Sequence, residues 1–184
     1  MAAHMLRAAP SRLPIRQRDI AGVMSVSPVR LTGMDEMGSA GRTGPFWDFI
    51  AGRVAPPPAA ATLGMNVQKV DPDRRDFEAT FEALGGFLNP AGNVQGGFIA
   101  AMLDETLGPA LAATLAPDEF APTLELKVNF LRPATLGTLR GKGRVVHRGG
   151  SIAFLAGELG DDTGRILATA TATAKIVKHD WAAR

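Results

Sequence analysis

The segment from Gly97 to Leu115 most constrains what this chain can fold into. Nearly every position in it is Ala, Leu, Met, Ile or Phe, so a helix formed here has no face polar enough to lie against water. The segment is long enough to span a membrane, but polar or helix-breaking residues interrupt it near its middle, at Asp104, Glu105, Gly108 and Pro109. We therefore predict the central helix of a globular domain, with protein on several of its sides.

Two acidic residues on this helix have different predicted roles. Burial of the Asp104 carboxylate would be costly without hydrogen bonds and would raise its pKa toward that of a useful base. Asp104 is therefore the first catalytic candidate, although an Asp at a subunit seam without chemistry fits the pattern as well. Glu105 points about 100° away around the helix axis and is expected at solvent or at an interface. Pro109 predicts a kink or restart near Leu107 and Gly108.

Strand-like runs with turn signals lie on both sides of the helix. Two precede it, Thr62–Val70 and Asp76–Leu84, and up to four follow it, at Thr123–Leu131, Leu136–Val146, Ile152–Leu159 and Ile166–Val177. This order predicts an α+β architecture in which one curved antiparallel sheet wraps around the helix. Pairing with a second subunit would cover the edge strands, so we expect a homodimer or a dimer of dimers.

The first 43 residues differ from the rest of the chain. Residues 1–43 carry a net charge of +3 and residues 44–184 carry −1, which gives the +2 of the whole chain. The folded part therefore has no general basic surface for nucleic acid. Residues 1–43 show no sustained apolar period and are interpreted as a disordered leader, as a transit peptide, or as the result of a misplaced translation start. The predicted domain is 44–184.

Several chemistries are excluded by residues that the chain lacks. It has no Cys, which excludes disulfides, thiolate metal sites and a cysteine nucleophile, and agrees with a cytoplasmic protein. The histidines, His4, His147 and His179, are too scattered in the sequence to indicate a zinc cluster. We expect no metal.

Ordered motifs between Trp47 and Val177 resemble the hotdog-fold acyl-CoA thioesterases, in particular the phenylacetate-degradation (PaaI-like) family. That family has an Asn, a His-Gly-Gly that opens the central helix, an Asp on the helix, and a Ser or Thr that starts the next strand. Those places are held here by Asn89, Gly96-Gly97, Asp104 and Thr123, whereas Gln95 stands where the family has His. Three further segments match the family: Asn129–Ala134, Arg148–Ile152 and Asp162–Thr169.

The resemblance implies a single hotdog domain that hydrolyses a small, medium or aryl acyl-CoA, with CoA as part of the substrate and no cofactor. The backbone N–H of Gly96, at the positive end of the helix, would polarise the thioester carbonyl. Asp104 would activate a water or attack the carbonyl, facing the Asn and Gly of the opposite subunit. Asn89 would orient the water or the carboxylate, and Thr123 would hold the water. Asn89 as a turn residue and Thr123 as an ordinary strand residue are the structural alternatives.

Gln95 can donate a hydrogen bond, as a neutral His can, but it cannot take up a proton near pH 7. Cations and backbone donors are needed for the CoA phosphates. The resemblance places CoA near a strand turn, at Arg148, Gly149, Gly150 and Ser151, with Arg132, Lys127 and Lys142 as further candidates. A tight hairpin with Gly149 and Gly150 at positive φ would explain these glycines without a ligand.

A short amphipathic helix is predicted from Gly44 to Gly52, followed by a stiff connector at Pro56–Pro58. Its apolar side chains would close an acyl-binding cavity or simply cover the core: Phe46, Trp47, Phe49 and Ile50.

Three other functions share the fold. Hotdog hydratases need a catalytic His, and neither His147 nor His179 lies on the central helix or its approach loop. Acyl-CoA sensors add a DNA-binding helical motif, but residues 1–43 lack helical periodicity. A non-catalytic acyl-CoA-binding protein, with turnover lost through Gln95, is the alternative that stays open. We expect no nucleic-acid partner and no membrane partner.

Overall fold

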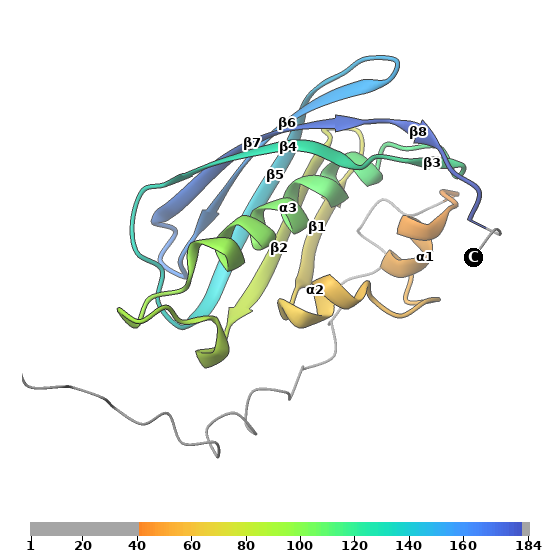
Figure 1. Cartoon of the computed structure of the whole chain (residues 1–184). Coiled ribbons are helices and arrows are strands. Elements are labelled where there is room, and N and C mark those ends of the chain that lie inside the picture. Colours follow the sequence, from red (N-terminus) through yellow and green to blue (C-terminus); the bar gives the residue numbers. More distant parts are fainter. Residues whose placement is uncertain (1–40, 182–184) are drawn as a thin grey trace, which may run out of the picture.

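Six antiparallel strands form one sheet, and a long helix lies across one of its faces (Figure 1). The structure is a computed structural model that describes residues 41–181, so the predictions for residues 1–40 lie outside the described residues. The sheet order is β1-β2-β5-β6-β7-β4. The strands are β1 (Asn66–Asp71), β2 (Asp76–Ala83), β4 (Thr123–Phe130), β5 (Gly137–Arg148), β6 (Ile152–Gly160) and β7 (Ile166–Lys175). This arrangement confirms the predicted α+β hotdog architecture.

The central helix α3 (Gly96–Ala112) is continuous through Pro109. The predicted restart near Leu107 is therefore wrong. The missing N–H of Pro109 removes only the bond to the carbonyl of Glu105. Burial of Leu107, Ala110 and Leu111 on both sides of the proline keeps the segment helical, because packing contributes more to a helix than local propensity does.

Glycines of the sheet let α3 lie directly on the strands. A Cβ added at Gly141 would be 2.3 Å from Oγ1 of Thr106, and one at Gly143 would be 2.7 Å from the Thr106 carbonyl oxygen. Thr106 is fully buried there and donates from Oγ1 to the Met102 carbonyl at 2.7 Å. Side chains at these sheet positions would push the helix away, so the two glycines set the distance between helix and sheet.

Only one face of α3 is fully covered in the single chain. Met102, Leu103 and Leu107 face the sheet and are buried, whereas Ala101 and Glu105 on the opposite side are partly exposed. The sequence predicted protein on several sides, but in the described chain the sheet covers one side. The other side is left for another molecule or for solvent.

Two short helices precede the sheet, α1 (Pro45–Ile50) and α2 (Pro58–Thr62). The first confirms the predicted amphipathic helix. The second helix was not predicted: Pro58 begins it, where a stiff connector was expected to end. The first strand begins at Asn66 and not at the predicted Thr62. Pro58 favours a helix start because its φ is already fixed, and Ala59–Ala61 continue the helix readily.

Residues before α1 contact the domain, because the Arg42 guanidinium lies 5.4 Å from the Trp47 ring centroid and 3.3 Å from Asp73.

The last predicted strand is divided in the structure. Strand β7 ends at Lys175, and β8 (Val177–Lys178) pairs with β3 (Glu119–Phe120) in a separate two-stranded sheet. Between them, the N–H of Ile176 donates to the Ser151 carbonyl at 2.8 Å. This bond turns the chain away from the main sheet. A 3₁₀ turn, η2 (Gly85–Phe87), leads from β2 toward α3.

Candidate active site

The start of α3 has one backbone donor that is capped and one that is not. Gln95 is the N-cap, and its Oε1 accepts from the Gly97 N–H at 2.6 Å. The N–H of Gly96, the first helical residue, donates no hydrogen bond to another described residue. It lies at the positive end of the helix, where an oxygen with developing negative charge is stabilised. Gln95 therefore also has a structural role, which the sequence analysis did not assign.

The Asn89 side chain is fixed by the turn that precedes the helix. Its Oδ1 accepts from the N–H of Ala91 at 2.9 Å and of Asn93 at 3.2 Å. The predicted turn role is therefore present. Because the oxygen is already used, the side chain can offer a ligand only its Nδ2 donors.

A pocket of 370 Å³ lies at this end of the helix. We call it the Gly96 pocket; it is lined by Asn89, Asn93, Val94, Gly96, Ile99, Phe130, Leu131, Arg132, Pro133 and Ala134. Three predicted site residues, Asn89, Gly96 and Arg132, therefore meet here. Arg132 is exposed at the pocket, and its Nη1 donates to the Ile166 carbonyl at 2.7 Å.

Asp104 and Thr123 are in direct contact. Oγ1 of Thr123, the first residue of β4, donates to Oδ1 of Asp104 at 3.0 Å. Asp104 is half-buried and lies toward the β4 edge of the sheet. Asp104 is eight residues after Gly96, about 12 Å along the helix axis. Within one chain, the carboxylate and the Gly96 amide therefore do not act on the same carbonyl group.

Glu105 follows Asp104 on α3 and is largely covered by the surrounding protein. Burial raises the pKa of Glu105, and the negative charge of the adjacent Asp104 raises it further. Its place on the face of α3 away from the sheet agrees with the predicted solvent or interface position.

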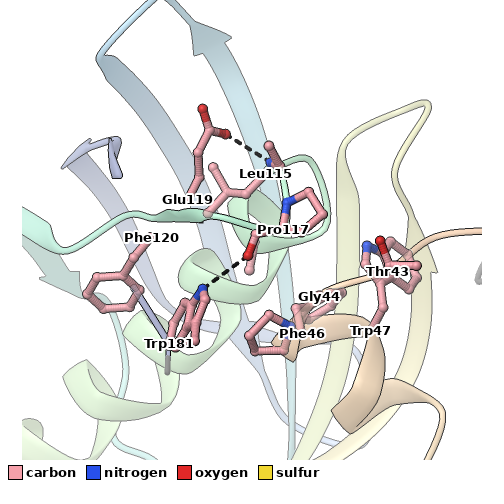
Figure 2. A pocket seen from close by; sticks show the side chains of 12 residues that line it. Thr43, Gly44, Phe46, Trp47, Leu115, Pro117, Glu119, Phe120 and Trp181 are labelled. Carbon is pink, nitrogen blue, oxygen red and sulfur yellow. Dashed lines mark hydrogen bonds between the residues drawn. The ribbon is translucent and has the colours of Figure 1, made fainter. Parts of the chain in front are cut away.

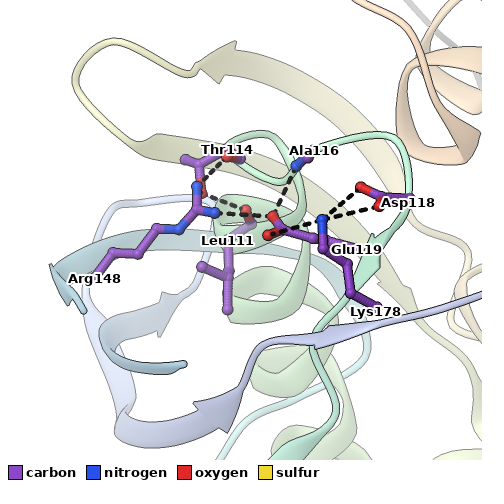
Figure 3. Close-up of polar contacts among 7 residues, drawn as sticks. All are labelled: Leu111, Thr114, Ala116, Asp118, Glu119, Arg148 and Lys178. Atoms are coloured by element: carbon purple, nitrogen blue, oxygen red, sulfur yellow. Dashed lines mark hydrogen bonds and ion pairs between the residues drawn. The ribbon is translucent and has the colours of Figure 1, made fainter. Parts of the chain in front are cut away.

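The predicted CoA-binding turn lies at the other end of α3, where Arg148 belongs to a polar cluster (Figure 3). Its guanidinium donates to the Thr114 carbonyl and, at 2.9 Å, to Glu119. Gly149 and Gly150 are not at positive φ, so that explanation for them is wrong. The turn is closed instead by the Gly149 N–H, which donates to the Ile152 carbonyl at 2.8 Å, and it also contains Ser151. These residues do not meet Gly96 within one chain.

A second cavity, of 150 Å³, lies between α1 and the C-terminal end of α3 (Figure 2). Phe46 and Trp47 line this cavity, and Trp181 closes it by donating from Nε1 to the Pro117 carbonyl at 3.1 Å. Trp47, Phe49 and Ile50 are buried. The aromatic residues of α1 therefore cover this end of the core and not the Gly96 pocket.

The remaining candidates lie elsewhere. Lys127 and Lys142 point to the sheet face opposite α3, where Lys142 lines a hollow of 580 Å³. His147 lies beside Phe154, and His179 packs on Trp181 with ring centroids 4.3 Å apart. Within residues 41–181, no group of three or more His, Asp or Glu side chains is arranged to hold a metal ion. None of the helices in that range has the length and apolarity needed to cross a membrane.

Comparison with known proteins identifies the family of this chain. The family model of the thioesterase superfamily matches residues 91–168, which contain Gly96, Asp104 and Thr123. A phenylacetic acid degradation-related protein from Ralstonia eutropha JMP134, assigned as a thioesterase, is 41% identical, with 71% of this chain and 98% of that chain aligned and a TM-score of 0.69. This chain belongs to the thioesterase superfamily. It is a PaaI-like hotdog thioesterase, as the motifs predicted, and thus a thioester hydrolase.

Two more distant structures share the fold. The PaaI protein of the Escherichia coli phenylacetic acid degradation operon is 18% identical over 73% of this chain and 94% of its own, with a TM-score of 0.65. A hypothetical thioesterase from Streptococcus pneumoniae TIGR4, solved with coenzyme A, is 22% identical over 62% of this chain and 87% of its own, with a TM-score of 0.57. No curated protein matches the chain.

Proposed function

We propose that this thioesterase hydrolyses acyl-CoA at a site shared by two copies of the chain. One copy supplies the Gly96 pocket, with the Gly96 N–H and the Asn89 amide. The other supplies the Asp104 carboxylate with Thr123. The coenzyme A bound to the S. pneumoniae thioesterase supports the choice of CoA esters.

The observation that carries this proposal is the hydrogen bond between Thr123 and Asp104. It ties the carboxylate to an edge strand, β4, whose outer edge pairs with no other described strand. Leu124 of this strand is 59% exposed, which favours pairing with a second copy. Because Asp104 is about 12 Å from Gly96 along its own helix, a twofold pairing is needed to bring the two groups to one thioester.

In the proposed reaction, hydrogen-bond donors stabilise the carbonyl oxygen, and a carboxylate activates water or attacks the carbonyl carbon. The thioester carbonyl accepts from the Gly96 N–H and from Nδ2 of Asn89, and both donors stabilise the oxygen as it becomes negative. Asp104 of the partner subunit takes a proton from a water held by Thr123, or attacks the carbonyl carbon to form a mixed anhydride. On the first route the activated water adds to the carbonyl carbon, the C–S bond breaks, and the thiolate of CoA takes the proton that Asp104 accepted. On the second route the C–S bond breaks as the anhydride forms, and a water then hydrolyses the anhydride to the free acid, restores the carboxylate and supplies the proton of the thiol. Arg132, on the pocket rim, is the proposed contact for a CoA phosphate.

Thiol release from a panel of short, long and aromatic CoA esters tests the activity. We expect wild-type protein to hydrolyse at least one ester, and Asp104→Asn to lower kcat by about a hundredfold or more. Glu105→Gln, next to it on the same helix, is the control and should keep most of the activity. If wild-type protein binds CoA esters but releases no thiol from any of them, the proposal is wrong and the chain is a non-catalytic acyl-CoA-binding protein.

Mixing two inactive variants tests the shared site. In random dimers of Asp104→Asn with Asn89→Ala, half of the dimers are mixed and each has one intact site, so we expect about a quarter of wild-type activity. A site within one chain would give no recovery after the subunits exchange. We also propose that neither a metal nor an organic cofactor takes part, so a chelator should leave the turnover unchanged.

A further inference from the structure

Phe130 is an aromatic residue in the Gly96 pocket to which the sequence analysis assigned no role and which the proposed mechanism does not use. It is the last residue of β4, pairs with Ala168 of β7, and faces the helix side of the sheet. The edge of its ring points at Gly96: a Cβ added there would be 3.2 Å from Cζ and 3.3 Å from Cε1. Phe130 is 55% exposed in the single chain, so contacts within this chain leave part of its side chain available to a ligand or to the second copy that the proposed site requires.

The ring is close enough to contact the reacting part of a thioester. Two covalent bonds join a Cβ to its own nitrogen, so the Phe130 ring edge lies within about 6 Å of the Gly96 nitrogen. A carbonyl oxygen hydrogen-bonded to that nitrogen places its carbon about 4 Å away. A substituent of this carbon that points to the Phe130 side of the pocket therefore comes within van der Waals reach of the ring.

The surroundings indicate that the ring meets the acyl side. Val94, Ile99 and Ala134 line the pocket and are buried, so together with Phe130 they offer a hydrocarbon surface. The polar groups, Asn89 and Arg132, suit the carbonyl and the CoA phosphates instead.

We propose that Phe130 determines specificity at the acyl α-carbon, so that the enzyme prefers thioesters that are unbranched there. This inference rests on the proposed function. A second substituent on the α-carbon would have to occupy the space of the ring edge. Pockets that accept or reject one extra carbon discriminate by roughly tenfold to two-hundredfold in kcat/KM.

The test compares butyryl-CoA with isobutyryl-CoA, isomers of four acyl carbons in which one methyl group is moved from the end of the chain to the α-carbon. We expect wild-type protein to prefer butyryl-CoA by roughly tenfold or more in kcat/KM. Phe130→Ala should reduce this ratio to about twofold, mainly by improving isobutyryl-CoA. Phe154→Ala is the matched control, because Phe154 is a similarly exposed phenylalanine (48%) that lines a hollow with Thr171 and Thr173, away from Gly96. It should keep the wild-type ratio.

Two outcomes would overturn the inference: a wild-type protein that does not prefer butyryl-CoA, or an unchanged ratio in Phe130→Ala, whether or not both esters lose activity equally. Sedimentation of each variant shows whether its oligomeric state is intact. If Phe130→Ala dissociates, Phe130→Leu carries the test and must still lower the ratio. Failure here differs from failure of the proposed function, because in the latter case wild-type protein releases no thiol from any ester.

Discussion

The two ends of helix α3 are built in opposite ways. At the C-terminal end, Arg148 bonds to Thr114 and Glu119, and Lys178 lies 2.9 Å from Asp118 (Figure 3). Both cations lie at the negative end of the helix, and Arg148 also donates to the carbonyl of Thr114, just after the helix ends. At the N-terminal end, the Gly96 N–H makes no bond to the described residues and opens into a pocket.

The difference separates the end of α3 that stabilises the fold from the end that is proposed to bind substrate. A cluster whose donors and acceptors are satisfied within the chain contributes to stability and has little left for a ligand. A helix end with a free N–H and an exposed aromatic ring contributes less to stability but can bind an oxyanion. Changes at the N-terminal end should therefore alter turnover, and changes at the C-terminal end should alter stability.

The largest expected effect is on the N-terminal end. Gly96→Ala should lower kcat/KM by about a hundredfold, comparable to the loss of one oxyanion donor, because its Cβ would press on Phe130 and obstruct the amide. Thiol release measures this. Combining it with Phe130→Ala makes room for the Cβ, so the double variant should be more active than Gly96→Ala alone. No recovery would mean that the methyl group itself blocks the substrate.

A smaller effect is expected at the C-terminal end. Arg148→Ala removes the ion-pair partner 2.9 Å from Glu119 and leaves this carboxylate with the Ala116 N–H and a longer contact, 3.9 Å, to Lys178. The Arg148 and Glu119 side chains are 25% and 16% exposed, so the pair is neither fully buried nor fully solvated. We expect a loss of about 2 kcal/mol in the free energy of unfolding, between the values typical of surface and buried pairs, with kcat kept. Urea unfolding measures it. Lys178→Ala, at an exposed pair, is the control and should cost less than Arg148→Ala. A large loss of kcat in folded Arg148→Ala would instead support its predicted contact with CoA.

Gln95 provides a further test of the N-terminal end, because its side chain caps the helix there by accepting from the Gly97 N–H. Gln95→Ala removes the cap on the Gly97 N–H and should cost about 1 kcal/mol of stability. Gln95→His should change turnover by less than about tenfold, since an imidazole can still hydrogen-bond at this position. A much larger change in thiol release would show that a proton carrier is needed there.

The smallest effect concerns pH and Glu105. Its folded pKa is raised above the ordinary 4.5, so the folded chain binds more protons than the unfolded chain between these values. Wild-type protein therefore loses stability as the pH rises from about 4.5 through the raised pKa. Glu105→Gln lacks this loss and should gain stability relative to wild type over the same range. Unfolding at pH 4 and pH 7 checks this; a constant difference would contradict it.

Several features could be predicted from the residues alone. The apolar run after Gly97 required a covered helix, and the turn signals between alternating runs gave the antiparallel strands, because periodicity reflects which side of an element is buried. Element ends were less predictable. Pro58 starts a helix where a connector was expected, and Pro109 lies within one, because packing on Leu107 and Leu111 outweighs a missing bond.

The sequence also identified candidate site residues, because their order along the chain follows a family pattern: Asn89, Gly96, Asp104 and Thr123. It did not predict the contact of Phe130 with Gly96 or the packing of Thr106 against Gly141 and Gly143, because these contacts join positions far apart in the chain.

What the sequence by itself determined is the central helix, the order of helix and strands along the chain, the family and the chemical groups available to it, all of which depend on local spacing. Only the tertiary structure decided that Arg148 bonds to Glu119 at one helix end and that Arg132 shares a pocket with Gly96 at the other. It also decided that Asp104 contacts Thr123. The physical reason is that a side chain's partners depend on how the sheet brings distant strands together, which no local pattern specifies.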